Sequence, residues 1–185
     1  MGVYWFMRRY LDKMRGYEAR PPGASPSEVF WSWAGGFLGI AAVGLMQVRL
    51  VQPSDQGLLI GSFGATAVLV YGAITSPLAQ PRNVLGGHLI SALIGVACHQ
   101  ALHQQPWLAA AAAVSLAIAA MQITRTLHPP GGATALIAVI GSQKIHSLGY
   151  LYALVPVGLG AAVMLLIALI VNNIPRSRRY PVFWL

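Results

Sequence analysis

Long apolar runs without an acidic residue restrict the fold of this chain more than any other feature. All four acidic residues lie at or outside the ends of these runs: Asp12, Glu18, Glu28 and Asp55. Only 9% of the 185 residues are charged, whereas a soluble domain carries about 25%. A helix satisfies its backbone hydrogen bonds internally and can therefore cross lipid. The sequence predicts an all-α integral membrane protein.

Six apolar segments are expected, over residues 26–47, 57–74, 84–101, 107–124, 131–141 and 150–171. Ser25, Pro26 and Glu28 form a helix-start signal of N-cap, first-turn proline and capping-box residue. Asn83 is expected to cap the third helix. The second segment is interrupted by glycine, and the fifth is shorter than the roughly 20 residues of a membrane-spanning helix. The alternative to six crossings is therefore four spans plus two re-entrant segments.

Lysine and arginine predict that both termini are cytoplasmic. If all six segments cross, ten of the twelve basic residues lie inside, and only Arg49 and Lys144 lie outside. If the second and fifth segments re-enter, the division is eight against four. We expect a multi-pass protein of the cell inner membrane, with an amphipathic basic segment at 1–24, a membrane domain at 25–172 and a basic, aromatic tail at 173–185.

Membrane lipids are the expected partner of the basic residues, because these concentrate at the two ends of a chain with a net charge of +8. Nucleic acid is not expected. A small bundle of this kind is compatible with a homo-oligomer.

A short sequence occurs twice. GATAVLV at 64–70 matches GATALIA at 132–138, and each lies in the middle segment of a trio. Three crossings in each half would make the second trio inverted relative to the first, as in many transporters whose sites lie at paired broken segments. The alternative is that both copies only allow small-residue helix packing.

Three motifs resemble those of the HPP family of integral membrane proteins. They are GSFGATAVLV at 61–70, SPLAQPRNVLGGHLISALIGV at 76–96 and RTLHPPGGATALIAVIG at 125–141, and the resemblance covers roughly residues 28–171. Members in chloroplasts and cyanobacteria are described as nitrite transporters. The resemblance implies nitrite as the candidate substrate.

The two short segments also predict a site for a small monovalent anion. A helix that begins within the membrane points unsatisfied N–H groups and a partial positive charge at what precedes it, and glycines let a solute approach the backbone. The candidates near the fifth segment are Arg125, His128, Pro129, Pro130, Gly131, Gly132 and Thr134. Those of the second segment are Gly61, Ser62, Gly64 and Thr66, and His88 is the candidate of the third. The resemblance adds Arg82 and Asn83, which precede the third segment.

Each of these residues also has a purely structural interpretation. Arg125 can anchor a helix in headgroups, and His128 can bond to a carbonyl at a helix boundary. Gly64 and Gly132 can serve close helix packing, and threonines can bond back to their own helix. A polar ring one turn inside the third helix is costly in lipid, so His88 favours a functional role.

The sequence lacks the motifs that several classes of function require. We expect no enzyme, cofactor or metal site, because the sequence has no carboxylate in a span, nucleotide-binding loop or hydrolase motif. His99 and His103 are four residues apart, but two ligands alone are a weak zinc signal. Channel-like passage and histidine-dependent proton coupling both fit the composition. The alternative functions are a non-transporting scaffold or subunit whose HPP segment binds a partner or lipid, and an enzyme that uses His128 and Arg125.

Overall fold

A computed structural model describes residues 2–16, 18, 20, 22–50 and 53–185. These residues form helices and no strand, which confirms the all-helical prediction. Among the described residues, four helical segments are long and apolar enough to cross a membrane. They are α2 (Pro26–Leu50), α4 (Pro81–Leu102), α5 (Pro106–Ile123) and the continuous pair η3 (Ala153–Gly158) and α8 (Leu159–Val171).

Two shorter apolar segments complete the bundle. Helix α3 (Pro53–Ala67) continues into the π-helical turn η1 (Val68–Gly72), and α6 spans only Pro130–Ile140, which confirms that the fifth segment is short. A 3-10 turn, η2 (Pro77–Ala79), precedes α4, and a short helix that we did not expect, α7 (Gln143–Leu148), follows α6.

Local chemistry set some of these boundaries as predicted. The Ser25 hydroxyl accepts a hydrogen bond from the Glu28 amide at 3.2 Å, as expected of an N-cap. The prediction that Asn83 caps α4 is wrong, because the helix begins at Pro81 with Gln80 at its N-cap position. Proline suits the first turn of a helix, where its missing N–H leaves no hydrogen bond unmade.

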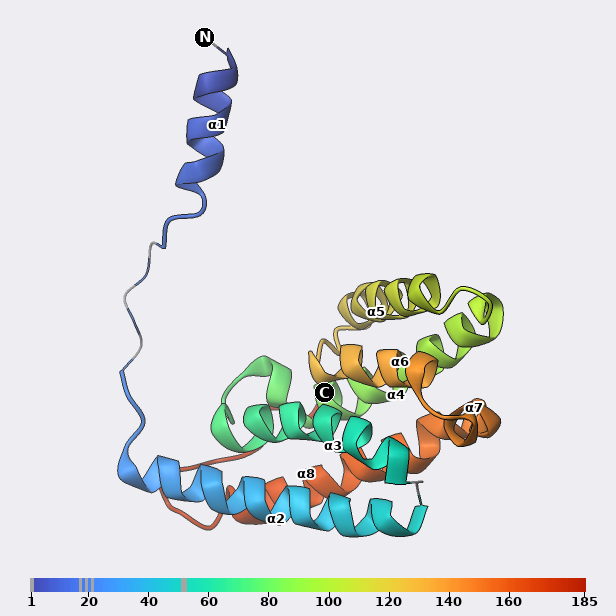
Figure 1. Cartoon of the computed structure of the whole chain (residues 1–185). Coiled ribbons are helices and arrows are strands. Elements are labelled where there is room, and N and C mark those ends of the chain that lie inside the picture. Colours follow the sequence, from blue (N-terminus) through green and yellow to red (C-terminus); the bar gives the residue numbers. More distant parts are fainter. Residues whose placement is uncertain (1, 17, 19, 21, 51–52) are drawn as a thin grey trace.

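The helices run between two ends of the bundle (Figure 1). We name one the Arg178 end, where Arg178 pairs with Glu28 and the Asn83 side chain donates to the carbonyl of Leu127. At the other, the Asp55 end, Asp55 accepts hydrogen bonds from Ser142. Six segments connect one end with the other: α2, α3 with η1, α4, α5, α6, and η3 with α8. Both short segments therefore lead from end to end.

Small residues bring α4 and α6 into backbone contact. A Cβ atom at Gly95 would lie 2.5 Å from the carbonyl oxygen of Ala135, and one at Gly131 would lie 2.7 Å from Ser91 Oγ. Close approach of this kind is how membrane helices pack without a hydrophobic driving force. The packing role that we considered for Gly64 and Gly132 is not what the structure shows: a Cβ at Gly64 meets nothing within 4 Å, and one at Gly132 meets only Val114 at 3.9 Å.

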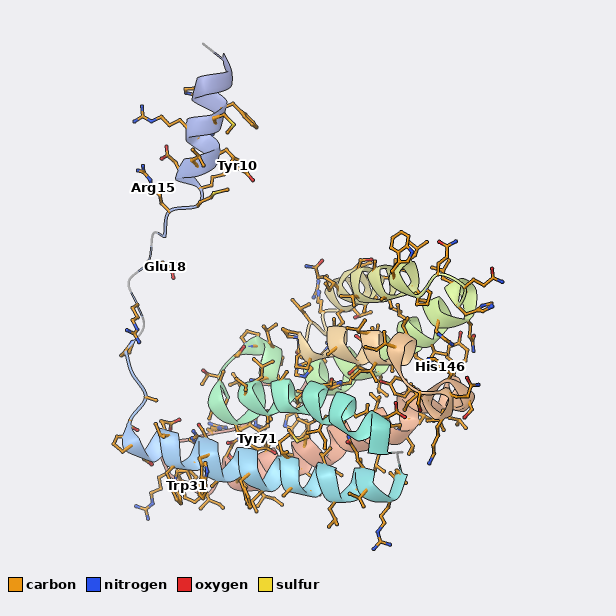
Figure 2. The ribbon with its side chains drawn as sticks, in the orientation of Figure 1. Tyr10, Arg15, Glu18, Trp31, Tyr71 and His146 are labelled. Carbon is orange, nitrogen blue, oxygen red and sulfur yellow. The ribbon has the colours of Figure 1, made fainter. Side chains whose placement is uncertain are left out.

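On the opposite side of the core, Tyr71 lies between α2 and α8 (Figure 2). Its hydroxyl donates to the carbonyl of Met164 at 3.0 Å, and Gly35 and Gly39 of α2 leave the space that its ring fills. The ring thereby joins α2, η1 and α8 in one packed unit.

Helix α1 (Gly2–Asp12) lies apart from the bundle (Figure 1). The amphipathic basic segment predicted at 1–24 is thus helical over Gly2–Asp12, and its place at the membrane surface stays a prediction. The Arg9 guanidinium lies 5.1 Å from the centre of the Trp5 ring, a cation–π contact within one helix.

Candidate functional site

Five polar side chains meet in the interior of the bundle, and all five were predicted site residues. Each is at most 2% exposed: Ser62 and Thr66 of α3, His88 of α4, His128 just before α6, and Thr134 of α6. We name these five residues the Ser-Thr-His cluster. Buried polar side chains between membrane helices are expensive and mark functional sites by default.

The cluster is a continuous chain of hydrogen bonds. Thr66 Oγ1 lies 2.8 Å from His88 Nε2 and 3.0 Å from His128 Nε2. On the other side of the His88 ring, Nδ1 lies 2.8 Å from Thr134 Oγ1, which lies 2.9 Å from Ser62 Oγ. Every member therefore has at least one partner inside the cluster.

The carbonyl of Leu78 sets the direction of this chain. It lies 2.8 Å from His128 Nδ1 and can only accept, so Nδ1 carries the hydrogen. In a neutral ring, His128 Nε2 then accepts from Thr66, and Thr66 accepts from His88 Nε2. His88 Nδ1 accepts from Thr134, and Thr134 shares the single Ser62 hydrogen with the carbonyl of Pro130. All hydrogens in the chain point the same way, from Ser62 to Leu78.

The HPP segment is attached to the start of α4. Arg82 donates to the carbonyl of Thr124 at 3.1 Å, and Asn83 donates to the carbonyl of Leu127 at 3.0 Å. Together with the bond from His128 to Leu78, these contacts fix residues 124–129 between α5 and α6 at three points. We name these residues the HPP loop. Arg82 and Asn83 thus position the HPP loop and lie outside the Ser-Thr-His cluster.

Arg125 is exposed and also lies outside the cluster. Its φ is 56°, in the left-handed region that favours glycine. The Thr126 amide bonds to the carbonyl of Met121 at 2.8 Å, and the Arg125 amide bonds to that of Gln122 at 3.2 Å, so Arg125 closes a Schellman motif after α5.

The predicted glycines and prolines divide into three groups. Gly131 packs tightly between helices, and the carbonyl of Pro130 accepts a 3.0 Å bond from Ser62. Gly61 is exposed and Gly64 is half-buried. Pro129 and Gly132 line an apolar groove of about 580 Å³ between α5 and α6 rather than the cluster.

Sequence reasoning missed a second buried polar centre, around Arg178. Its guanidinium donates to the carboxylate of Glu28 at 2.8 and 3.0 Å, to Asn172 Oδ1 at 3.1 Å and to Ser32 Oγ at 2.7 Å. The sequence alone places Arg178 in the basic, aromatic tail at 173–185. The signal that could have found it is Glu28, an acidic residue in the first turn of an apolar helix that needs a nearby cation.

The tail after α8 is tied to the same end. The Tyr180 hydroxyl donates to the carbonyl of Ala79 at 2.6 Å, and the Val182 amide donates to Gln80 Oε1 at 2.7 Å. Burial raises the pKa of Tyr180 above its usual range, so the hydroxyl stays protonated as a donor. The tail thereby covers η2, whose Leu78 holds His128.

His99 and His103 lie at the Asp55 end, away from the cluster. His99 stacks on His146, with ring centres 3.7 Å apart (Figure 2 labels His146). In the part of the chain that the structure describes, no three His, Cys, Asp or Glu side chains lie close enough together to hold a metal ion.

Comparison with known proteins supports the family that the three motifs indicate. A family model described as "HPP, transmembrane region" matches residues 21–181. The chain belongs to the HPP family. Two transmembrane proteins of Dictyostelium discoideum are each 45% identical to this HPP protein over its whole length, and the chain spans 60% and 65% of their respective lengths. No solved structure matches.

Proposed function

We propose that this HPP protein moves a small monovalent anion across the membrane, with nitrite as the candidate that the family implies. The supporting observation is the position of Thr66 and Thr134. They occupy the same place in the two GATA sequences, and they bond to opposite nitrogens of His88. Paired positions that meet at one buried polar group are typical of transporters built from two repeats.

The depth of the cluster agrees with this proposal. Ser62 lies almost three helical turns before the end of η1, so it is roughly 15 Å from the Arg178 end, near the middle of a hydrocarbon core about 30 Å thick. His128 lies close to that end, beside Leu78. The cluster therefore extends from the surface region to the middle of the bundle, as a substrate site would.

For the topology, we propose six crossings arranged as a 3+3 inverted repeat. Support comes from α3 with η1 and from α6, each of which connects the Arg178 end with the Asp55 end. The Arg178 end also holds Arg82, Arg125 and the basic tail. The positive-inside rule then places this end and both termini in the cytoplasm, and for a bacterial cell the membrane is the inner one.

A non-transporting scaffold is the second candidate, favoured by the apolar groove of about 580 Å³ between α5 and α6. In the membrane this groove would hold lipid or a second copy of the chain. Under either candidate we propose no enzymatic activity and no cofactor, because the cluster contains neither a carboxylate nor a thiol.

The test is nitrite uptake by liposomes that contain the purified protein. We expect the initial rate to exceed that of empty liposomes at least about tenfold, and Ser62→Ala to reduce it. Ser115→Ala, at an exposed position on α5, is the matched control. A rate equal to that of empty liposomes for nitrite and for other small anions would exclude transport and leave the scaffold.

A further inference from the structure

The Ser-Thr-His cluster contains no donor that an anion could use without cost. With both imidazoles neutral, the hydrogens of Thr66, Thr134, His88 and His128 each occupy one bond of the directed chain. The Ser62 hydroxyl is shared between Thr134 and the carbonyl of Pro130. An anion that enters must therefore break an existing bond or arrive with an additional proton.

No fixed positive charge is available at the cluster either. No charged residue that the structure describes has a hydrogen bond to any of its five side chains. The nearby titratable or charged groups have other partners: Arg82 bonds to Thr124, Asp55 to Ser142, Tyr71 to Met164 and Tyr152 to the carbonyl of Thr134. Cys98 and His99 of α4 belong to the Asp55 half, and Arg125 is exposed. An anion buried here without a countercharge would be strongly disfavoured.

The two threonines provide a place for one extra proton. Thr66 Oγ1 lies 3.3 Å from the carbonyl of Ser62, four residues earlier in α3. If His128 Nε2 gains a proton, the Thr66 hydroxyl can turn to that carbonyl, and its oxygen then accepts from both imidazoles. No backbone movement is needed.

Thr134, in the second GATA sequence, has the same arrangement as Thr66. Thr134 Oγ1 lies 3.4 Å from the carbonyl of Pro130, also four residues earlier. If His88 Nδ1 gains the proton instead, the Thr134 hydroxyl can turn to Pro130 and accept from His88. Each threonine switch is therefore paired with the imidazole that the other half of the chain contributes.

We propose that the Ser-Thr-His cluster takes up one proton with each anion, so that the protein is an electroneutral proton–anion symporter. The proton leaves water, forms an N–H bond on His128 or His88, and supplies the countercharge for the bound anion. It returns to water on the far side when that N–H bond breaks, and no other covalent bond changes. This inference rests on the proposed anion transport.

The deciding experiment separates a pH gradient from a membrane potential in liposomes that contain the full chain. With potassium and valinomycin holding the potential at zero, an outside pH one unit lower should raise the initial nitrite uptake several-fold above that of empty liposomes. A one-unit gradient can support about tenfold accumulation of a proton-coupled anion. At equal pH, an inside-positive potential of roughly 59 mV, which would draw in an uncoupled anion about tenfold, should leave uptake unchanged.

Different failures have different meanings. Uptake that follows the potential and ignores the pH gradient would overturn proton coupling and leave anion transport standing. Uptake that never exceeds the empty-liposome rate would overturn anion transport itself, and the symport with it. Neither result depends on a variant that must fold.

Variants then test the threonine switches. Thr66→Val and Thr134→Val keep the shape and remove the hydroxyl, so we expect at least about tenfold slower pH-driven uptake. Thr66→Ser and Thr134→Ser keep the hydroxyl and should stay within about twofold of wild type. Wild-type uptake and wild-type pH response in monodisperse valine variants would remove the threonines from the mechanism.

Discussion

Thr66 and Thr134 bond to opposite nitrogens of the His88 imidazole, each at 2.8 Å. The two threonines come from short helices that lie far apart in the sequence and share the GATA motif. Both nitrogens of the His88 ring are therefore paired in the interior of the bundle.

His88→Ala should therefore destabilise the protein. The change removes the two hydrogen bonds that the buried ring makes with Thr66 and Thr134 and leaves a cavity in a dry interior, and large-to-small changes of this kind cost about 2–5 kcal/mol. We expect a loss of about 2–5 kcal/mol in the free energy of unfolding, measured by denaturant titration in detergent. His103→Ala, at an exposed position after α4, should change it by less than about 0.5 kcal/mol. Equal stability of the two variants would contradict the structure.

The two glycines of the HPPGG motif should respond differently to the same change. A methyl group at Gly131 would lie 2.7 Å from Ser91 Oγ and 2.9 Å from the carbonyl of Gly87, whereas one at Gly132 has only Val114 at 3.9 Å. We expect Gly131→Ala to cost about 1–3 kcal/mol and Gly132→Ala to be neutral or slightly stabilising. Thermal unfolding in detergent measures both, and a reversed order would refute the packing of α4 on α6.

Arg125→Gly should stabilise the loop after α5. Arginine holds a φ of 56° there, a conformation that costs a side-chain-bearing residue about 1 kcal/mol relative to glycine. The gain should be absent in Arg125→Ala, which removes the charge and keeps the strain. If alanine stabilises the protein as much as glycine does, the benefit comes from the lost charge instead. Nitrite uptake should be unchanged in both variants, because Arg125 lies outside the cluster.

Arg178 should contribute more to the free energy of unfolding than its neighbour Arg179 does. Its side chain is 1% exposed and pairs with Glu28, whose side chain is 35% exposed. Removing a buried partner of an ion pair costs about 3–5 kcal/mol, and the partial exposure of Glu28 lowers our expectation to about 2–3 kcal/mol. Arg179→Ala, at the exposed neighbouring position, is the matched control. Comparable denaturation midpoints for Arg178→Ala and Arg179→Ala would show that the pair contributes nothing.

The six-crossing topology predicts opposite accessibility for two exposed residues. In a Cys98→Ala background, Arg125→Cys should react with a membrane-impermeant thiol reagent only from the cytoplasmic side, and Lys144→Cys only from the outside. Labelling of both from one side of intact cells would favour the arrangement with re-entrant segments. The test is independent of any transport assay.

The sequence alone determined the membrane class, the order of the apolar segments and several helix boundaries. These features are local: the lengths of apolar runs and the capping of α2 by Ser25 depend on neighbouring residues. The two GATA sequences, His88 and His128 also pointed to the interior site, because polar groups within apolar segments are costly wherever they lie.

Only the tertiary structure decided which of these residues meet. Ser62 and Thr134 lie 72 residues apart, and Arg178 and Glu28 lie 150 apart. No local rule gives the docking of α6 on α4 that selects Gly131 over Gly132, or the contacts that assign Arg82 and Asn83 to the HPP loop. Hydrogen bonds and close packing depend on ångström-scale positions, which arise only when all the helices are in place.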